Sequence, residues 1–292
     1  MQNIFNILRK ILHIILPTNI LGDKIYSIIN FIINHKRLPS KKMLFNDYMY
    51  RLKTSNEIIN PLRVFVTDKI NLKKFVKKEI GNKYNVPTIK IFDTFNQINK
   101  YKFPHRCIIK PTHLSGEVII KSDRAKINYN KIKKWFETNY YDRARERNYK
   151  NLRPKVIIEP ILFNNANISD YKFFCYKGSV NILQIDHDRF KNRSKSFYKL
   201  NLKKKKYSWK KQHFYNYKLS KKILQKPKNL NQMIKITKKL SKSFEFIRVD
   251  LYTNQEDIYV GELTSICGNA SLKFYPKNSE KLFSQIVFSK TN

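Results

Sequence analysis

The sequence contains few cysteines and no long apolar run. Cys107, Cys175 and Cys267 are far apart, and no CxxC or Cys/His pattern accompanies them, which argues against structural zinc and a disulfide framework. No stretch of 18 residues is free of charged side chains, so no membrane-spanning helix is expected. Arg9 and Lys10 interrupt the apolar N-terminus, so it is not a standard signal peptide. We therefore expect a cytoplasmic protein with reduced thiols.

Acidic residues are also scarce. Asp and Glu total 21 against 60 Lys and Arg, and the formal net charge is +39. Such a charge indicates one of three partners: nucleic acid, an anionic membrane face or a polyanionic substrate. The lysines are scattered through a chain rich in Asn and Ile, which an AT-rich gene would also produce. The basic run at residues 203–206 fits either a solvated loop or a phosphate or lipid contact.

The N-terminal residues have the spacing of an amphipathic helix. Its apolar positions are Ile4, Leu8, Ile11, Leu12 and Ile15. With basic residues among them, this pattern fits a helix that lies on an acidic bilayer surface. A helix packed on the body of the protein fits it equally well. We assign residues 1–60 to a helical extension and residues 61–292 to the main region of the chain.

The rest of the chain mixes strand and helix patterns. We expect strands at residues 63–69, 86–95, 105–121 (two strands), 154–162, 170–190 (a hairpin that turns at Lys177 and Gly178) and 246–264 (two strands). We expect helices at residues 70–81, 129–145 and 229–244, and a basic irregular stretch from about 190 to 228. This order predicts an α+β fold with largely antiparallel sheets.

Two of the rare acids lie in the last two expected strands. Because side chains alternate along a strand, Arg248 and Asp250 share one face, and Ile258, Val260 and Glu262 share a face of the next strand. A five-residue loop would place Arg248 opposite Glu262 with Asp250 diagonal to it, whereas an even-numbered loop would separate the two acids. Two convergent carboxylates fit Mg²⁺, which completes its shell with phosphate and water. A surface hairpin with a weak ion pair is the alternative.

Two lysines could hold phosphates. Lys110 ends an apolar strand before a turn of small residues, and Lys69 follows another expected strand; loop amides and an ammonium group suit a triphosphate. The GxxxxGK[ST] pattern is absent, and either lysine could be a solvated turn residue. Glu159 closes the strand "KVIIE" and could contact a base or form a salt bridge.

The order of the motifs carries a resemblance. "TDKINLKKFV", "CIIKPTHLSGEVIIK", "VIIEPIL", "DYKFFCYKG", "DHDRF", "RVDLY" and "YVGELT" follow one another between residues 45 and 276. This series resembles the TupA-like branch of the ATP-grasp superfamily, which is associated with teichuronopeptide and capsular polysaccharide synthesis. The resemblance implies two α+β lobes that clamp a nucleotide, a lid lobe at about 105–160 and a metal-binding lobe at about 161–280.

The resemblance also implies roles for individual residues. Lys69 and Lys110 would contact the phosphates of ATP, and the loop from Thr112 to Val118 would cover them. The remaining nucleotide contacts would be His113, Ser115, Gly116, Glu159, Ile161, Leu162, Asp170 and Lys172, with Glu159 at the adenine and Asp170 at the ribose. Asp250 and Glu262 would hold Mg²⁺, and Arg248 with Lys110 would act on the transferred group. The loop has Leu114 where the branch usually has glycine, and Thr264 replaces a frequent Asn.

The implied reaction joins an amine to a carboxylate through an acyl phosphate made with ATP. The expected partners are an anionic, uronic-acid-containing glycan, an amine donor and the inner face of the cell membrane. A glycosyltransferase that uses Asp186, His187 and Asp188 as a DxD-type metal site is the first alternative. A nucleic-acid binder is the second, although the aromatics lie in apolar strands away from the basic clusters.

Overall fold

The structure is a computed structural model. It describes residues 11–123, 126–164, 168–187, 194–203, 206–212, 214, 225–276 and 278–289. The helices are α2 (Ile20–His35), α3 (Phe45–Thr54), α4 (Pro61–Thr67), α5 (Lys69–Ile80), α6 (Phe95–Asn99), α7 (Tyr129–Glu137), α8 (Tyr140–Ala144), α9 (Leu230–Ser241) and α10 (Ser279–Val287). Short 3₁₀ turns are η1 (Asn56–Ile59), η2 (Asn82–Tyr84), η3 (Arg147–Tyr149), η4 (Leu162–Asn164) and η5 (Cys267–Ala270). No helix among the described residues is long and apolar enough to cross a membrane.

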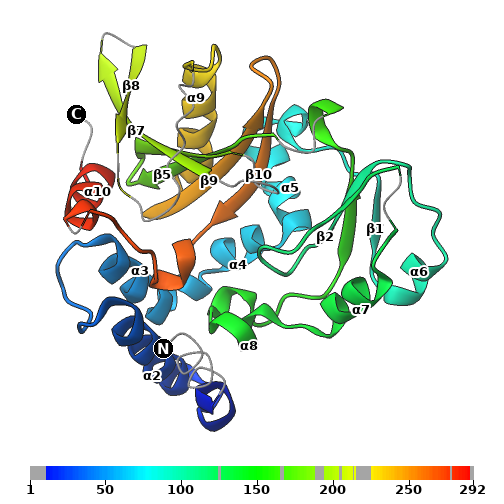
Figure 1. Cartoon of the computed structure of the whole chain (residues 1–292), viewed down its shortest axis with the longest axis horizontal. Coiled ribbons are helices and arrows are strands. Elements are labelled where there is room, and N and C mark those ends of the chain that lie inside the picture. Colours follow the sequence, from blue (N-terminus) through cyan, green and yellow to red (C-terminus); the bar gives the residue numbers. More distant parts are fainter. Residues whose placement is uncertain are drawn as a thin grey trace.

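The strands form two antiparallel sheets (Figure 1). The first has the order β1-β4-β2-β3 and the second the order β10-β9-β5-β6-β7-β8. Their bounds are β1 (Lys90–Phe92), β2 (Cys107–Pro111), β3 (Ile119–Lys121), β4 (Val156–Glu159), β5 (Asp170–Tyr176), β6 (Ser179–His187), β7 (Ser194–Lys203), β8 (Lys206–Gln212), β9 (Phe246–Thr253) and β10 (Ile258–Thr264). The expected α+β architecture is confirmed.

One face of the six-stranded sheet is largely apolar. Side chains at every second position of β9, among them Val249 and Leu251, join a core with α5 and α9. The alternation predicted for β9 is therefore confirmed.

The opposite face changes character along each strand. Phe174 of β5 and Phe246 of β9 pack in a second core with α3 and α10. Two residues away on β5, Lys172 is buried among carboxylates. This change leaves a polar floor at one end of the sheet, next to the first sheet.

Three expectations about elements are wrong. Residues 63–69 are not a strand, because most of them belong to helix α4. The Asn60 side chain caps this helix by accepting a hydrogen bond from the Leu62 amide, and Pro61 lies in its first turn. Residues 129–145 form two helices, since α7 ends at Glu137 and Asn139 caps α8. Part of the stretch from 190 to 228 is regular, because β7 and β8 extend the second sheet.

Candidate functional site

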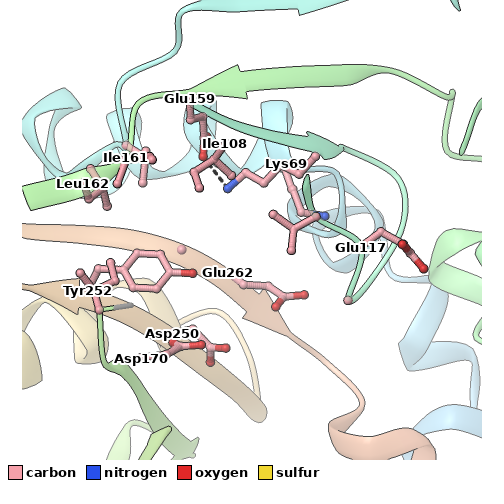
Figure 2. Close-up of a pocket in the computed structure, with 16 residues that line it drawn as sticks. Lys69, Ile108, Glu117, Glu159, Ile161, Leu162, Asp170, Asp250, Tyr252 and Glu262 are labelled. Carbon is pink, nitrogen blue, oxygen red and sulfur yellow. Dashed lines mark ion pairs between the residues drawn. The ribbon is translucent and has the colours of Figure 1, made fainter. Parts of the chain in front are cut away.

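A cleft of about 960 Å³ of atom-free space, open to solvent, lies between the two sheets. Figure 2 shows its walls: Glu159 and Ile108 come from the first sheet, while Asp250, Tyr252 and Glu262 face them from the second. Nine residues expected at the site line it: Lys69, Lys110, Gly116, Glu159, Ile161, Leu162, Asp170, Asp250 and Glu262. Residues distant in sequence thus meet at one opening.

A β-bulge brings the two acids together. The turn between β9 and β10 contains residues 254–257, an even number, and Ile258 pairs with Thr253. The turn is therefore not the five-residue loop on which the pairing of Arg248 with Glu262 depended, and Arg248 lies opposite Thr264 instead. The register shifts between Val260 and Glu262, which places Glu262 directly opposite Asp250.

The bulge also reverses the faces of β10. Val260 lies in the apolar core, so Glu262 does not share its face as expected. Gly261 lies within the shift, where a Cβ would come within 2.6 Å of the Tyr252 ring. A glycine therefore allows the bulge and the cleft-lining Tyr252 to pack closely.

Asp250 is buried under a network of cations. Arg248 donates from Nε to Oδ1 and from Nη2 to Oδ2, each at 2.7 Å, and Lys172 Nζ lies 2.6 Å from Oδ2. Lys172 also forms an ion pair with Asp170. Burial alone would raise the pKa of Asp250, but Arg248 and Lys172 hold it below its ordinary value. Arg248 and Lys172 therefore lie behind the cleft wall, where they fix the carboxylate.

Glu262 is more accessible than Asp250. Its side chain is 33% exposed, and its ion pair with Arg248 Nη2 is 4.0 Å long. Among the described residues, no group of three or more His, Cys, Asp or Glu could hold a metal ion. Mg²⁺ needs only one or two carboxylates when phosphate and water complete its shell.

The two acids fit one Mg²⁺ ion. Glu262 would supply its carboxylate, and Oδ1 of Asp250 accepts a single hydrogen bond in the structure, from Arg248, which leaves a lone pair. The hydroxyl of Thr264 accepts a hydrogen bond from Arg248 at 3.0 Å. The described residues therefore offer little for a second ion.

Lys69 lies at the start of α5, below the loop at residues 112–118. Its amide donates to the Thr112 carbonyl at 3.2 Å, and its Nζ donates to the Leu114 carbonyl at 2.6 Å. Burial lowers the pKa of Lys69 to about 8. Gly116 has a φ of +78°, a conformation that glycine adopts without strain. Leu114 is buried in the core of the first sheet, so the residue that departs from the family pattern anchors the loop.

Two expected loop contacts do not reach the cleft. His113 is buried, and its Nε2 lies 2.9 Å from the Trp135 carbonyl of α7. Ser115 lines a different hollow, together with Lys131 and Tyr140. The sequence placed both with the nucleotide because it could not show which way each side chain of the loop turns.

Glu159 holds two lysines instead of one. Lys110 Nζ lies 2.5 Å from its Oε2, and Lys73 Nζ lies 2.7 Å from its Oε1. Burial would raise the pKa of Glu159, but the two ammonium groups lower it. Sequence analysis missed Lys73, although it lies four residues after Lys69 and so on the same face of α5. It also missed the apolar lining at Val86, Ile108 and Ile168, beside Ile161 and Leu162, which forms a slot suited to a flat base.

Most of the chain matches a known protein family. A family model described as TupA-like ATPgrasp matches residues 48–287. D-alanine–D-alanine ligase from Bacillus anthracis is similar in structure at 16% identity and a TM-score of 0.40, over 76% of this chain and 66% of that one. The corresponding ligase from Helicobacter pylori has 14% identity and a TM-score of 0.41, over 78% and 61%. The chain thus spans two thirds or less of these proteins. Curated proteins gave no significant match.

Proposed function

Because the chain belongs to the TupA-like ATP-grasp family, an ATP-grasp ligase family, we propose that it is an ATP-dependent carboxylate–amine ligase. Its antiparallel sheets form the α+β ATP-grasp fold. The observation that carries the proposal is one continuous cleft, which joins Lys69 and Lys110 to Asp250 and Glu262. Two cations for phosphates and two acids for a metal ion lie on opposite walls of one space.

The two ends of the cleft differ in polarity. Its apolar end, at Ile108, Ile161 and Leu162, would take the adenine, and Asp170 beside it would take the ribose. Lys69 and Lys110 would contact phosphate oxygens, and Lys110 would exchange its ion pair with Glu159 for the nucleotide. The terminal phosphate would then lie near Glu262.

The chain's own residues would supply positioning and charge neutralisation, which dominate phosphoryl transfer. Mg²⁺ bound to Asp250 and Glu262 would neutralise charge on the phosphates. Arg248 lies beside both acids but behind the cleft wall, so it would act through them, by holding the Asp250 carboxylate in place under the metal ion. A substrate carboxylate would attack the terminal phosphorus, ADP would leave, and an amine would displace phosphate from the resulting acyl phosphate.

The substrates we propose are a uronic-acid carboxylate on a cell-surface glycan or its precursor, and an amine. The formal charge of +39 supports an anionic acceptor. The glycosyltransferase alternative has less support. Asp186 is completely buried and accepts a hydrogen bond from Gln184 at 2.5 Å, so it does not face a cleft. Asp188 lies outside the described residues.

Binding of nucleotide tests the proposal. Mg·ATP at about 100 times its Kd should stabilise the wild type by about 2.7 kcal/mol, a rise in Tm of about 5 °C or more. The measurement is thermal unfolding with Mg·ATP, with ATP plus EDTA, and with a UDP-sugar plus Mg²⁺. Stabilisation by the UDP-sugar, with none by Mg·ATP, would contradict a ligase and favour the glycosyltransferase.

We also propose that the N-terminal segment holds the protein on an anionic membrane face. Ile11, Ile14, Ile15, Ile20 and Leu21 are 43%, 83%, 71%, 50% and 64% exposed. The acid nearest to them in sequence, Asp23, is buried and paired with Arg145 at 3.2 Å. Exposed aliphatic side chains without exposed acids suit a bilayer interface. Residues 1–10, which include Ile4 and Leu8 of the expected helix, lie outside the described part.

Vesicle sedimentation tests this surface. The wild type should sediment with phosphatidylglycerol vesicles, and the double variant Ile14→Asp/Ile15→Asp should bind at least tenfold more weakly, because each buried isoleucine contributes about 1.5–3 kcal/mol. Ile89→Asp is the matched control. Ile89 is also an exposed isoleucine, at 40%, but it lies next to β1 in the four-stranded sheet and not in the N-terminal segment. Equal binding of all three proteins would contradict the proposal.

A further inference from the structure

A second hollow adjoins the nucleotide cleft at the loop of residues 112–118. Its atom-free space is about 920 Å³ and is open to solvent. Ser115 lines the hollow, Gly116 lines the cleft, and Glu117 lines both. The two spaces therefore meet at Glu117, and a molecule bound in one of them lies next to the other.

Glu117 lies at the end of the cleft away from the apolar slot. In Figure 2 it is on the far side of Glu262 from Ile161 and Leu162, and its carboxylate points away from the acids of the cleft. In the proposed orientation of the nucleotide, the terminal phosphate and the acceptor carboxylate meet at this end. The hollow is thus on the acceptor side of the nucleotide.

Three donors from two helices converge on the Glu117 carboxylate. From α7, Lys131 Nζ lies 3.1 Å from Oε2, and the Trp135 indole nitrogen donates to the same oxygen at 3.3 Å. From α8, Arg143 Nη1 lies 3.8 Å from Oε1. Charged donors of this kind bind carboxylates well, and the protein places one carboxylate, its own, in this hollow.

The contacts of Glu117 are weak enough to be exchanged. The side chains of Glu117, Lys131 and Arg143 are 28%, 40% and 71% exposed. Ion pairs as accessible as these contribute about 1 kcal/mol or less. A carboxylate that enters from solvent can therefore take the place of Glu117 at little cost.

The rest of the wall suits a sugar that carries a negative charge. Among the described residues that line the hollow, Lys134 adds a third cation against one acid, Glu117. Trp135 and Tyr140 supply aromatic surface, and Thr138 supplies a hydroxyl group. Aromatic walls with a few polar groups are typical of ligand sites, and the apolar C–H face of a pyranose ring can cover aromatic surface.

We propose that this hollow binds a uronic-acid residue of the acceptor glycan, whose carboxylate displaces Glu117 from Lys131 and Arg143. The inference rests on the proposed ligase function and deepens it, because it assigns the anionic acceptor a place in the fold. The carboxylate held in the hollow is a recognition group. The carboxylate that reacts belongs to a neighbouring sugar of the same glycan and lies in the cleft.

Calorimetric titration of digalacturonate into the Mg·AMP-PNP complex tests the inference, in about 0.15 M salt to screen non-specific attraction. The wild type should bind this disaccharide and should not bind neutral cellobiose. Lys131→Met should weaken the affinity about tenfold or more, the loss expected for a hydrogen bond to a charged group. Lys133→Met is the matched control: it removes an exposed lysine of the same helix that does not line the hollow, and it should bind as the wild type does.

Replacing Glu117 distinguishes displacement from a purely structural role. Glu117→Ala removes the internal competitor, so digalacturonate should bind about two- to fivefold more tightly, the equivalent of up to about 1 kcal/mol. If the Glu117 ion pairs only hold the hollow in shape, the variant should instead bind more weakly. No gain of affinity in Glu117→Ala would overturn the inference.

The remaining outcomes are equally decisive. Equal affinity of Lys131→Met and Lys133→Met would overturn the inference, and so would binding of L-glutamate as tight as that of digalacturonate, since the hollow would then not select a uronic acid. No binding of digalacturonate to a wild type that still binds AMP-PNP would overturn it and leave the ligase function intact. Failure of AMP-PNP to bind the wild type would instead contradict the ligase function.

Discussion

Replacing Asp250 with alanine should destabilise the protein and abolish binding of Mg·ATP. The substitution leaves Lys172, which is 6% exposed, and Arg248 without the carboxylate that accepts their hydrogen bonds. Removing one member of a buried ion pair costs about 3–5 kcal/mol. The expected fall in Tm is about 6–20 °C, measured by circular dichroism, with nucleotide binding followed by calorimetry below that Tm.

The loss of stability at acidic pH provides an independent test of the ion-pair network around Asp250. Since the pKa of Asp250 is lower in the folded protein, its stabilisation is full above the unfolded value of about 3.9 and is lost as the pH falls further. Asp250→Ala should therefore lose less stability than wild type between about pH 4 and 2. Asp257→Ala, at an exposed acid of the same hairpin, should match wild type. A variant as stable as wild type would show that the network contributes little.

The faces of β9 could be predicted from sequence, but the register of β10 could not. Alternation in "FIRVDLY" is regular, so Asp250 was placed correctly opposite the core. The bulge at Gly261 depends on the fit of its backbone against the Tyr252 ring, a contact between two strands. Without the bulge, the even-numbered turn would have put Glu262 on the apolar face. The two acids were thus expected on one face for an incorrect reason.

Helix α4 shows how alternation can mislead. "RVFVT" alternates as a strand does, yet Asn60 and Pro61 are a typical helix start. Arg63 decides the outcome, because its Nη1 donates to the Phe246 carbonyl at 2.9 Å inside the core. The local signals favour both structures, and the tertiary hydrogen bond selects the helix.

The burial of Glu146 could not have been predicted from the sequence. It lies between Arg145 and Arg147, where an acid usually forms a salt bridge. In the structure both arginine side chains bind other groups: Arg145 pairs with Asp23, and Arg147 donates to the Ser55 carbonyl. Glu146 is only 4% exposed, and burial is a property of the folded chain.

Glu262→Gln should separate metal binding from stability. The side chain is 33% exposed and its ion pair with Arg248 is 4.0 Å long, so its loss should change the free energy of unfolding by less than about 1 kcal/mol. The amide is a much weaker Mg²⁺ ligand than the carboxylate. ADP formation should fall about 100-fold or more, because even residues that only support metal ligands cost 10- to 100-fold when replaced.

A magnesium titration distinguishes this cause from others. If Glu262 is a ligand, the Mg²⁺ concentration for half-maximal nucleotide stabilisation should rise in Glu262→Gln, while ATP binding in EDTA stays unchanged. Glu256→Gln, in the exposed turn of the same hairpin, should behave as wild type. Unchanged Mg²⁺ dependence in Glu262→Gln would remove the second carboxylate from the metal site. Asp250, whose Oδ1 accepts a hydrogen bond from Arg248, would then have to hold the ion as a single carboxylate, with phosphate and water completing the shell.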